Sequence, residues 1–187
     1  MLPLYNKNNH KYAYKCKTFS TSFIKEYLLH TYYKSPYSHP IIANLWLGSY
    51  VDAANEEFVY KNNINVIINC TADVPFYFDS SITQQHRVPV DDDLKDKSFN
   101  SMSYYLPNIV DTIHSHLAQG DRVYVHCRSG KQRSACVVAC YLMAHEHKTK
   151  DEAIVYIKSI RNACFNPCVN FEKCMKEYEL NFITTVV

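Results

Sequence analysis

The sequence predicts an α/β fold: a single domain with a central, mainly parallel sheet of about four to five strands, flanked by helices. Short apolar, β-branched runs alternate with segments of helical periodicity, as in sheets whose strands are connected by helices. The chain has 187 residues, which suffices for one domain with a core. Hydrophobic residues make up 47% and only 3 residues are glycine, which excludes a disordered or low-complexity chain.

Residues 1–37 are predicted to form an arm and an extra N-terminal helix, separate from a main domain at residues 38–182. Residues 1–19 are polar, basic and rich in tyrosine, which is typical of a terminal arm. Their lysines could touch an anionic surface, and the alternative is a solvated tail. Apolar residues recur at helical spacing over residues 22–33, so an amphipathic helix is expected there, ending at Ser35-Pro36.

The elements of the main domain follow in alternation. Gly48 closes the first strand, and Gln119-Gly120 ends a long helix that is expected to carry Pro107 in its first turns. Thr149 and Glu152 have the spacing of a capping box. In chain order we expect a strand at 41–47, a helix at 53–61, strands at 64–69 and 84–90, a helix at 101–117, a strand at 123–126, and helices at 135–147, from 149 to about 162, and at 169–180.

Composition excludes several classes of protein. A formal charge of +2 is too small to predict a nucleic-acid partner, so any basic site must be local. The first ten residues are polar where a signal peptide needs an apolar run, and no apolar stretch approaches the length of a membrane span. The eight cysteines do not form a short secreted framework, so we expect free thiols and a cytoplasmic location.

The strongest functional signal is the segment from His126 to Ser134, HCRSGKQRS. It follows a predicted strand and opens a predicted helix, whose unpaired N–H groups and dipole favour an anion. Five residues between Cys127 and Arg133 suffice to curl the loop around one phosphate, and Gly130 permits the torsions that this needs. The predicted substrate-binding residues are Arg128, Ser129, Gly130, Lys131 and Gln132.

The residue types in this segment indicate nucleophilic catalysis. The field that favours an anion also favours the thiolate of Cys127, which is therefore the candidate nucleophile. Arg133 offers a planar fork for two phosphate oxygens. Ser134 can donate a hydrogen bond to the sulfur and improve it as a leaving group, whereas His126 is expected to orient the loop. The alternative is a core cysteine beside a solvated basic turn. In that case the occurrence of His, Cys, Gly, Arg and Ser at these positions is a coincidence.

A leaving group needs a proton, and a carboxylic acid near the pocket could supply it. Asp91, Asp92 and Asp93 follow the strand that is predicted to end at Val90. The alternative is that these acids, together with Asp96, form a solvated turn. Spacing alone does not choose among the three.

HCRSGKQRS resembles the His-Cys-x5-Arg-Ser signature of protein tyrosine phosphatases, specifically of the small dual-specificity branch. The likeness extends from about residue 22 to residue 180 and includes WLGSY (46–50), VIIN (66–69), VPVDD (88–92) and VACYLM (138–143). It implies the tyrosine phosphatase-like fold and a phosphocysteine intermediate. It also selects Asp92 as the general acid and gives Asn69 the role of bracing the active loop. We expect no cofactor.

Within that branch the chain is most similar to the poxvirus-type enzymes, whose N-terminal helix resembles FIKEYLL (23–29) and KSP (34–36). In that group the helix is exchanged between subunits. The resemblance therefore implies a domain-swapped homodimer of a viral protein, in the host cytoplasm or the virion; the alternative is a helix packed on its own subunit. The segment from Asp92 to Cys127 is longer than usual, so the loop at 93–100 is expected to be extended.

Three functions remain open at this point. The first is a protein phosphatase of phosphotyrosine and phosphoserine or phosphothreonine, because the chain lacks the Asn-Arg-Tyr-type loop that deepens the pocket of tyrosine-only enzymes; phosphorylated proteins are its expected partners. The second is a phosphatase of polyanions, a phosphoinositide or an RNA 5′-triphosphate, since Arg128 and Lys131 add two cations to the loop. The third is a phosphate-binding module without turnover.

The remaining cysteines admit other roles. A zinc site is conceivable near the C-terminus, but the spacings fit no standard closed site, so we expect no metal. Its candidate ligands would be Cys164, Cys168, Cys174, His145 and His147. Cys136 and Cys140 lie on one helix face and are expected in the core. Cys70 ends the strand beneath the loop and could form a disulfide with Cys127 on oxidation; the alternative is a buried thiol.

Overall fold

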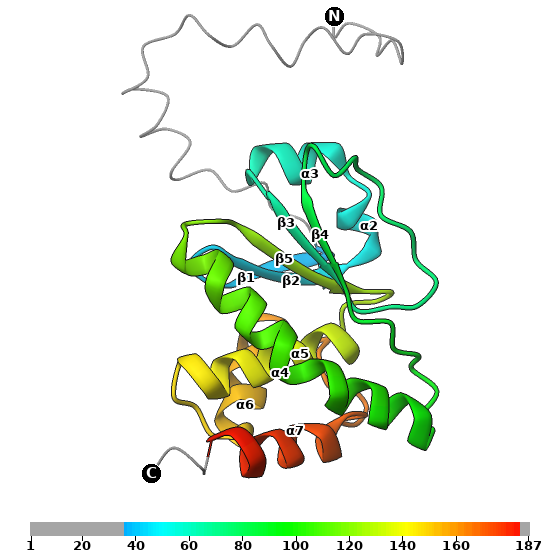
Figure 1. Cartoon of the computed structure of the whole chain (residues 1–187), viewed down its shortest axis with the longest axis vertical. Coiled ribbons are helices and arrows are strands. Elements are labelled where there is room, and N and C mark those ends of the chain that lie inside the picture. The colour runs from blue at the N-terminus through cyan, green and yellow to red at the C-terminus, as the bar shows by residue number, and fades with distance from the viewer. Residues whose placement is uncertain (1–35, 184–187) are drawn as a thin grey trace, which may run out of the picture. The chain divides into compact units, whose positions relative to one another are not determined.

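A computed structural model describes residues 36–183, so the predicted arm and the helix at 22–33 lie outside the described residues. The five-stranded sheet has the order β1-β2-β5-β3-β4 (Figure 1). β1 (Ser38–Ile42) runs antiparallel to β2 (Leu45–Ser49), and β5 (Val123–Cys127), β3 (Val66–Asn69) and β4 (Gln84–Arg87) continue the sheet in parallel. The predicted mainly parallel α/β fold is confirmed.

Both faces of the sheet are buried. Alternate residues of the central strands point to opposite faces, and helices cover each face. Val123 and Val125 of β5 join the larger core cluster, whereas Tyr124 joins the smaller one. The smaller cluster packs against α2 (Tyr50–Ala53) and α3 (Glu56–Lys61). The larger lies against α4 (Asp96–Ala118), α5 (Arg133–His145), α6 (Lys150–Ile160) and α7 (Glu172–Tyr178), on the other face (Figure 1).

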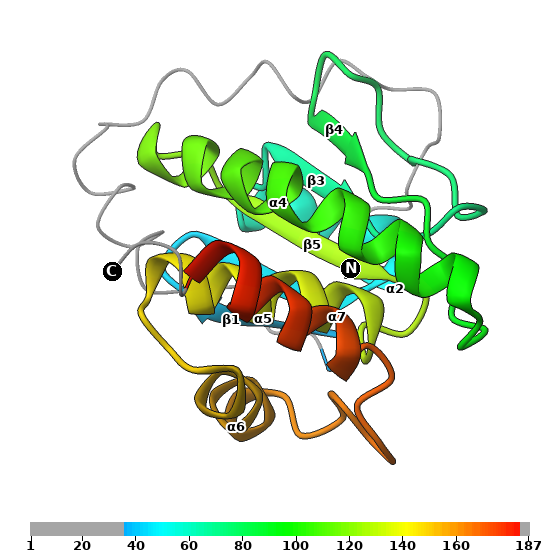
Figure 2. The ribbon, with the colours of Figure 1, turned by 60° about the horizontal axis from the view of Figure 1, so that its bottom comes forward.

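The helix that follows the HCRSGKQRS segment is central to the fold. Every residue of α5 from Arg133 to Met143 is buried, and the helix packs against α4, α6 and α7. Figure 2 shows α4, α5 and α7 side by side over one face of the sheet. A helix that is apolar on all sides needs such surroundings. The N-terminus of α5 is therefore fixed by the core.

Two predicted elements near the N-terminal edge are wrong, because turns divide them. The expected strand at 41–47 is a hairpin of β1 and β2, since Asn44 takes a left-handed φ of 63°, which asparagine tolerates better than most residues. The expected helix at 53–61 is two helices, because the side chain of Asn55 accepts a hydrogen bond from Phe58 N (3.2 Å) and caps α3.

The long helix differs from its prediction in a way that affects the acidic segment, residues 91–95. α4 begins at Asp96 rather than at residue 101, so the expected extended loop at 93–100 is wrong. Pro107 lies in the middle of α4 rather than in its first turns, although a proline there lacks the N–H that would donate to the preceding turn. Residues 96–100 therefore belong to a helix that packs on the core.

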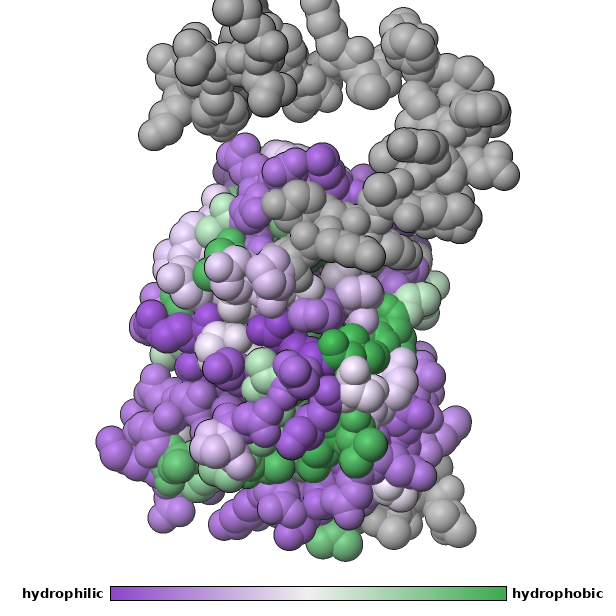
Figure 3. Space-filling model, turned by 180° about the vertical axis from the view of Figure 1, so that it is seen from behind, coloured by the Kyte–Doolittle hydropathy of each residue, from purple (hydrophilic) through white to green (hydrophobic). Residues whose placement is uncertain are grey.

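The other boundaries differ by a few residues, as expected where the last turn frays. The predicted capping box of α6 is present, with Thr149 and Glu152 bonded reciprocally. The last predicted helix is α7, which begins at Glu172 and continues as a π-helical turn, η2 (Glu179–Ile183). Among the described residues, none of the helices is long and apolar enough to cross a bilayer. Figure 3 shows one face of the molecule, where most residues are hydrophilic and the hydrophobic residues form a few separate groups.

Candidate active site

The segment from Cys127 to Arg133, here called the phosphate loop, lies where three parallel strands end. It leaves β5 between β2 and β3, with Ser49 paired to Cys127 on one side and Asn69 paired to His126 on the other. Ligand sites of parallel α/β sheets lie outside the carboxyl ends of the strands. The loop then enters α5 directly, so a helix N-terminus faces the same point.

The curl of the phosphate loop follows from what its carbonyl groups bind. Four successive carbonyl oxygens accept hydrogen bonds from outside the loop. Since the two ends of a planar trans peptide point in opposite directions, the N–H groups of these peptides face the centre. The bonds are Tyr50 N to Arg128 O (3.4 Å), Arg161 Nη2 to Ser129 O (3.2 Å), Arg161 Nε to Gly130 O (3.0 Å) and Phe165 N to Lys131 O (2.9 Å).

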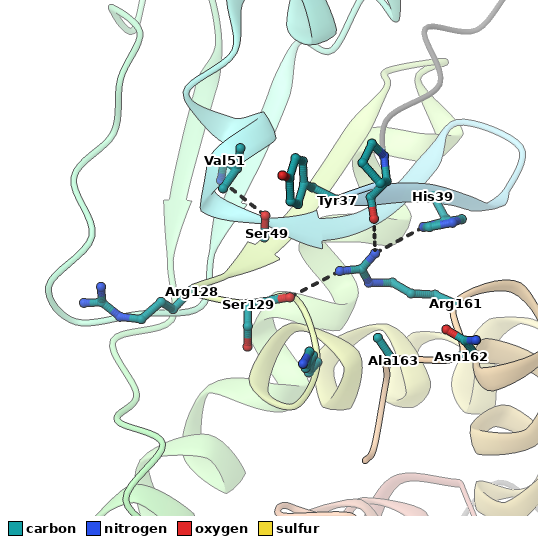
Figure 4. Close-up of a pocket in the computed structure, with 11 residues that line it drawn as sticks. Tyr37, His39, Ser49, Val51, Arg128, Ser129, Arg161, Asn162 and Ala163 are labelled. Atoms are coloured by element: carbon teal, nitrogen blue, oxygen red, sulfur yellow. Dashed lines mark hydrogen bonds between the residues drawn. The ribbon is translucent and has the colours of Figure 1, made fainter. Parts of the chain in front are cut away.

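Arg161 is the main external support of this curl. Its side chain is buried, and beyond its two bonds to the loop its Nη1 donates to Pro36 O (3.3 Å) and lies 3.2 Å from His39 Nδ1. Figure 4 shows the guanidinium between the start of β1 and the phosphate loop. The sequence did not reveal this residue, because an arginine at the end of a helix carries no signal for a contact that far away in the chain.

Gly130 is required by the backbone, as predicted from the sequence. Its φ is 64°, in the left-handed region. A Cβ at this position would lie 2.3 Å from both the carbonyl carbon and oxygen of Gly48, in backbone that cannot easily move. Only glycine therefore fits both the torsion and the close approach to β2.

The thiol of Cys127 lies at the centre of the loop and is fully buried. Burial by itself raises the pKa of Cys127, but hydrogen bonds and charge outweigh it and lower the pKa below the usual value for a thiol. The opposing causes are the hydroxyl and N–H of Ser134, the Arg133 charge and the N–H of Lys131. Ser134 Oγ donates to the sulfur at 3.2 Å. The site therefore favours a thiolate.

His126 is held as a neutral ring. Burial lowers its pKa to about 4, and the nearby Arg87 acts in the same direction against a hydrogen bond to the backbone. Its Nδ1 lies 3.4 Å from Cys127 O, a carbonyl that can only accept, so Nδ1 carries the hydrogen. The ring thus orients the start of the loop.

Arg133 is buried and points from the first turn of α5 toward the acidic segment. Its Nη1 donates to Val90 O at 3.0 Å, which directs the guanidinium toward the end of the strand-and-turn segment at residues 84–90. Its Nε lies 3.6 Å from Asp92 Oδ2. The guanidinium therefore stands between the phosphate loop and one particular acid.

The three neighbouring acids have different surroundings. Asp93 turns toward α4, where it accepts from Ser98 Oγ (2.6 Å) and Lys95 N (3.1 Å). The Ser98 hydrogen bond, with those from Lys95, lowers the pKa of Asp93 to about 2, so it is ionised at neutral pH. Asp91 is exposed. Among the three, Asp92 is the acid that faces Arg133.

Gln132 connects the phosphate loop with the segment before α7. The side chain is buried; its Nε2 donates to Cys168 O (2.8 Å), and its Oε1 accepts from Asn170 N (3.1 Å). Asn170 Nδ2 in turn donates to Asp92 Oδ1 at 3.0 Å. Asn170 was not identified from the sequence, because no pattern links it to residue 92. The contact exists only in the folded chain.

The side chain of Asn69 is bonded within the turn that follows β3, and the bracing role that the resemblance implied stays a prediction. Its side chain accepts from Thr71 N and Oγ1 (3.1 and 2.7 Å) and donates to Val74 O (2.8 Å). These bonds shape the turn that carries Asp73, and Asp73 forms an ion pair with Arg128.

The two predicted cations of the loop, Arg128 and Lys131, are exposed. Both border a pocket of about 400 Å³ beside the phosphate loop. Val51, Ser129 and Arg161 also line it (Figure 4). The charge of Arg128 is offset by its ion pair with Asp73. Lys131 thus provides the less compensated cation at this rim.

The other cysteines do not converge. Cys164 contacts Gly130 O (3.4 Å), Cys168 is exposed, and Cys174 lies on α7 near Phe99 O (3.5 Å). Within residues 36–183, no group of three or more His, Cys, Asp or Glu side chains could hold a metal. Cys136 and Cys140 lie in the larger core cluster.

Cys70 is a free, buried thiol at the end of β3. Burial, followed by the charge of Cys127, raises the pKa of Cys70 well above its usual value. A disulfide between Cys70 and Cys127 stays a prediction.

A model of the dual specificity phosphatase catalytic domain matches residues 45–181. Human dual specificity protein phosphatase 9 is 30% identical over 140 residues, and mouse dual specificity protein phosphatase 1 is 30% identical over 139 residues. Each alignment covers 74% of this chain but only 35% and 36% of the relative. The chain therefore spans about a third of the length of these curated relatives.

Solved structures show the same fold. Human DUSP28 aligns with a TM-score of 0.68 at 25% identity, over 79% of this chain and 95% of that one. Human tyrosine phosphatase-like serine/threonine/tyrosine-interacting protein aligns with a TM-score of 0.68 at 23% identity, over 78% and 97%. At such identities the second likeness carries the fold alone.

Proposed function

This chain belongs to the dual specificity phosphatase family, and on that premise we propose that it is a cysteine-dependent phosphatase of phosphotyrosine and phosphoserine or phosphothreonine in proteins. One observation carries the proposal: the Cys127 thiol, with a lowered pKa, lies at the centre of a curl of N–H groups ahead of a helix. The loop binds an anion, and the thiolate at its centre is a nucleophile. A phosphate monoester is an anion with an electrophilic phosphorus atom, so it fits both properties.

In the first step the Cys127 sulfur attacks phosphorus as the phosphorus–oxygen bond to the substrate breaks. The phosphoryl group binds to the N–H groups of the loop and to Arg133. The departing oxygen takes a proton, and Asp92, which faces Arg133 at 3.6 Å, is the proposed donor. The products of this step are the dephosphorylated hydroxyl and a phosphocysteine.

In the second step water attacks the phosphocysteine, and the Asp92 carboxylate takes the proton of that water. The sulfur leaves as a thiolate. Ser134 stabilises it by the hydrogen bond that it donates to Cys127 (3.2 Å). Inorganic phosphate then departs, and Asp92 is again protonated for the next substrate.

The dual specificity part of the proposal rests on the depth of the site. In this family the walls of the site are set by loops, and the sequence carries no obvious Asn-Arg-Tyr-type segment that would raise them. A site without such walls admits the short side chain of phosphoserine as well as that of phosphotyrosine.

The test is a panel of phosphotyrosine and phosphothreonine peptides, with acid quenching to trap a phosphoenzyme. We expect turnover of both classes and a trapped phosphate that maps to Cys127. Turnover without any phosphoenzyme at Cys127 would overturn the mechanism. Binding without turnover by the wild-type chain would instead favour a phosphate-binding module.

A polyanion phosphatase is the second candidate, favoured by the pocket of about 400 Å³ that Arg128 and Lys131 border. Cations beside a phosphate site attract further phosphates. A phosphoinositide assayed beside a phosphotyrosine peptide separates the candidates. If the phosphoinositide is preferred and Lys131→Ala abolishes only that preference, the second candidate replaces the first.

The proposals for assembly and location rest on the resemblance of residues 23–36 to the poxvirus-type enzymes. Almost all of these residues lie outside the part of the chain that the structure describes. We propose a homodimer with exchanged N-terminal helices, acting in the cytoplasm on phosphorylated proteins. Light scattering of the full chain should give twice the mass of one chain. The variant Leu28→Asp, which places a charge on the apolar face of the predicted helix, should lower it. A single-chain mass for the wild type would contradict the proposal.

A further inference from the structure

We propose that Asn170 is a positioning residue for the general acid. It holds the Asp92 carboxyl group with Oδ2 toward the bound phosphate, and Gln132 ties it to the phosphate loop. The inference rests on the proposed function, since it gives Asp92 the role of acid. It concerns a residue that lies 78 positions from Asp92 in the chain.

The amide of Asn170 has one orientation that satisfies both of its neighbours. Its Nδ2 lies 3.0 Å from Asp92 Oδ1, and its Oδ1 lies 3.3 Å from Cys168 Sγ. A thiol is a donor and a carboxylate an acceptor, so turning the amide over would place acceptor against acceptor at Asp92. The N–H of Asn170 therefore points at Asp92.

This contact distinguishes the two oxygens of the Asp92 carboxyl group. Oδ1 accepts from Asn170, whereas Oδ2 lies 3.6 Å from Nε of the buried Arg133, the side chain that is proposed to bind the phosphoryl group. A proton on Oδ1 would point at the amide hydrogens, so the acidic proton belongs on Oδ2. Asn170 thus directs the proton toward the departing oxygen of the substrate.

The position of Asn170 is set by the phosphate loop itself. Its backbone N–H donates to Oε1 of the buried Gln132 (3.1 Å), while Gln132 Nε2 donates to Cys168 O (2.8 Å). The next residue, Phe171, is buried and packs edge-to-face on Phe99, with ring centroids 5.7 Å apart. The acid is consequently tied to the phosphate loop through Gln132 and Asn170 as well as through Arg133.

These contacts allow positioning to be separated from folding. The backbone of Asn170 is anchored by Gln132 whatever its side chain, so Asn170→Ala removes the contact with Asp92 and keeps the segment in place. The side chain is half-buried, which leaves little packing to lose. A thermal melt close to that of the wild type is therefore expected.

The experiment measures kcat for aryl phosphates whose leaving groups differ in pKa, because a poor leaving group depends on the acid more than a good one. For Asn170→Ala we expect a loss of about 10–100-fold with phenyl phosphate, as for one hydrogen bond to a charged group, and a much smaller loss with 4-nitrophenyl phosphate. In an Asp92→Asn background, Asn170→Ala should cause no further loss. The matched control is Asn100→Ala, an exposed asparagine on α4.

An equal loss for all leaving groups, or no loss, would overturn the proposal. Should Asn170→Ala not fold, Asn170→Asp gives a second measurement. A carboxylate at this distance disfavours the ionised form of Asp92, so the descending limb of the pH profile should move to higher pH. An unmoved limb would also overturn it. Failure of the proposed function would differ from both, since the wild-type chain would then hydrolyse no aryl phosphate.

Discussion

The phosphate loop and the acidic segment meet at Arg133, but they are held in different ways. In the phosphate loop, Cys127 and Gly130 are buried, and four successive carbonyl oxygens are bound from outside. The acidic segment at residues 91–95 is exposed, and side chains fix it: Asp93 bonds to Ser98, and Asp92 to Asn170. One region is built from main chain and core, and the other from a few surface contacts.

This difference teaches which parts of the chemistry can vary independently. A loop held by its backbone keeps its shape when an exposed side chain such as Lys131 changes. A segment held by single side-chain contacts loses its geometry when one of them is removed. We therefore expect substitutions of the buried residues of the phosphate loop to abolish the reaction, and substitutions in the acidic segment to slow it.

The largest expected effect compares two buried thiols, Cys127 with a lowered pKa and Cys70 with a raised one. Cys127→Ser should lower kcat by about 10⁴-fold or more, since a serine hydroxyl in this site does not ionise near neutral pH. Cys70→Ala is the matched control, because Cys70 is equally buried at the end of the adjacent strand but its pKa is raised. Steady-state assays should show Cys70→Ala within a few-fold of the wild type. Equal losses would break the comparison.

The next effect tests the acidic segment. Asp92→Asn should lower kcat for phenyl phosphate by about 10²–10⁴-fold, because the departing oxygen loses its proton donor. Asp93→Asn should change kcat by less than about 10-fold, since its carboxylate faces Ser98 and α4. If both variants lost activity equally, Asp92 would have no separate role, and the acid would remain unassigned between them.

Arg161 tests whether the phosphate loop depends on its external support. Arg161→Ala leaves the carbonyls of Ser129 and Gly130 without their donor, and we expect about 2–4 kcal/mol lower stability and about 10-fold weaker binding of vanadate, which mimics phosphate. Arg122→Ala, which removes a bond to Asn62 O at the opposite end of β5, should weaken vanadate little. Thermal melts and vanadate titrations measure both quantities. Unchanged vanadate binding in Arg161→Ala would show that the loop keeps its curl unaided.

The smallest effect concerns one hydrogen bond and is seen best in a pH profile. Ser134 lowers the pKa of Cys127, so Ser134→Ala should raise that pKa and move the ascending limb of kcat/KM to higher pH. At a pH below this limb, a thiol whose pKa is higher by one has a thiolate fraction about 10-fold smaller. Alkylation by iodoacetate measures the same thiolate without the chemistry of turnover. A limb that stays in place would mean that Arg133 and the loop N–H groups suffice.

The sequence predicted the elements whose causes are local. The parallel strands, α5 and the capping box of Thr149 follow from periodicity and spacing, and the structure has them with small differences at their ends. The hairpin at Asn44 and the division of α2 from α3 were not predicted, because each depends on one asparagine that is bonded locally or takes a left-handed torsion. One asparagine interrupts a strand or helix but hardly changes the hydrophobic periodicity of the segment around it.

By itself the sequence determined where the phosphate loop lies and which side chains it carries, since a cysteine and an arginine with five residues between them lie between a strand and a buried helix. The tertiary structure decided everything that joins distant segments: Arg161 beneath the loop, Asp92 facing Arg133, and Asn170 on Asp92. The physical reason is range. Backbone torsions and a helix terminus act over a few residues, whereas a contact between remote side chains exists only after the core has placed both.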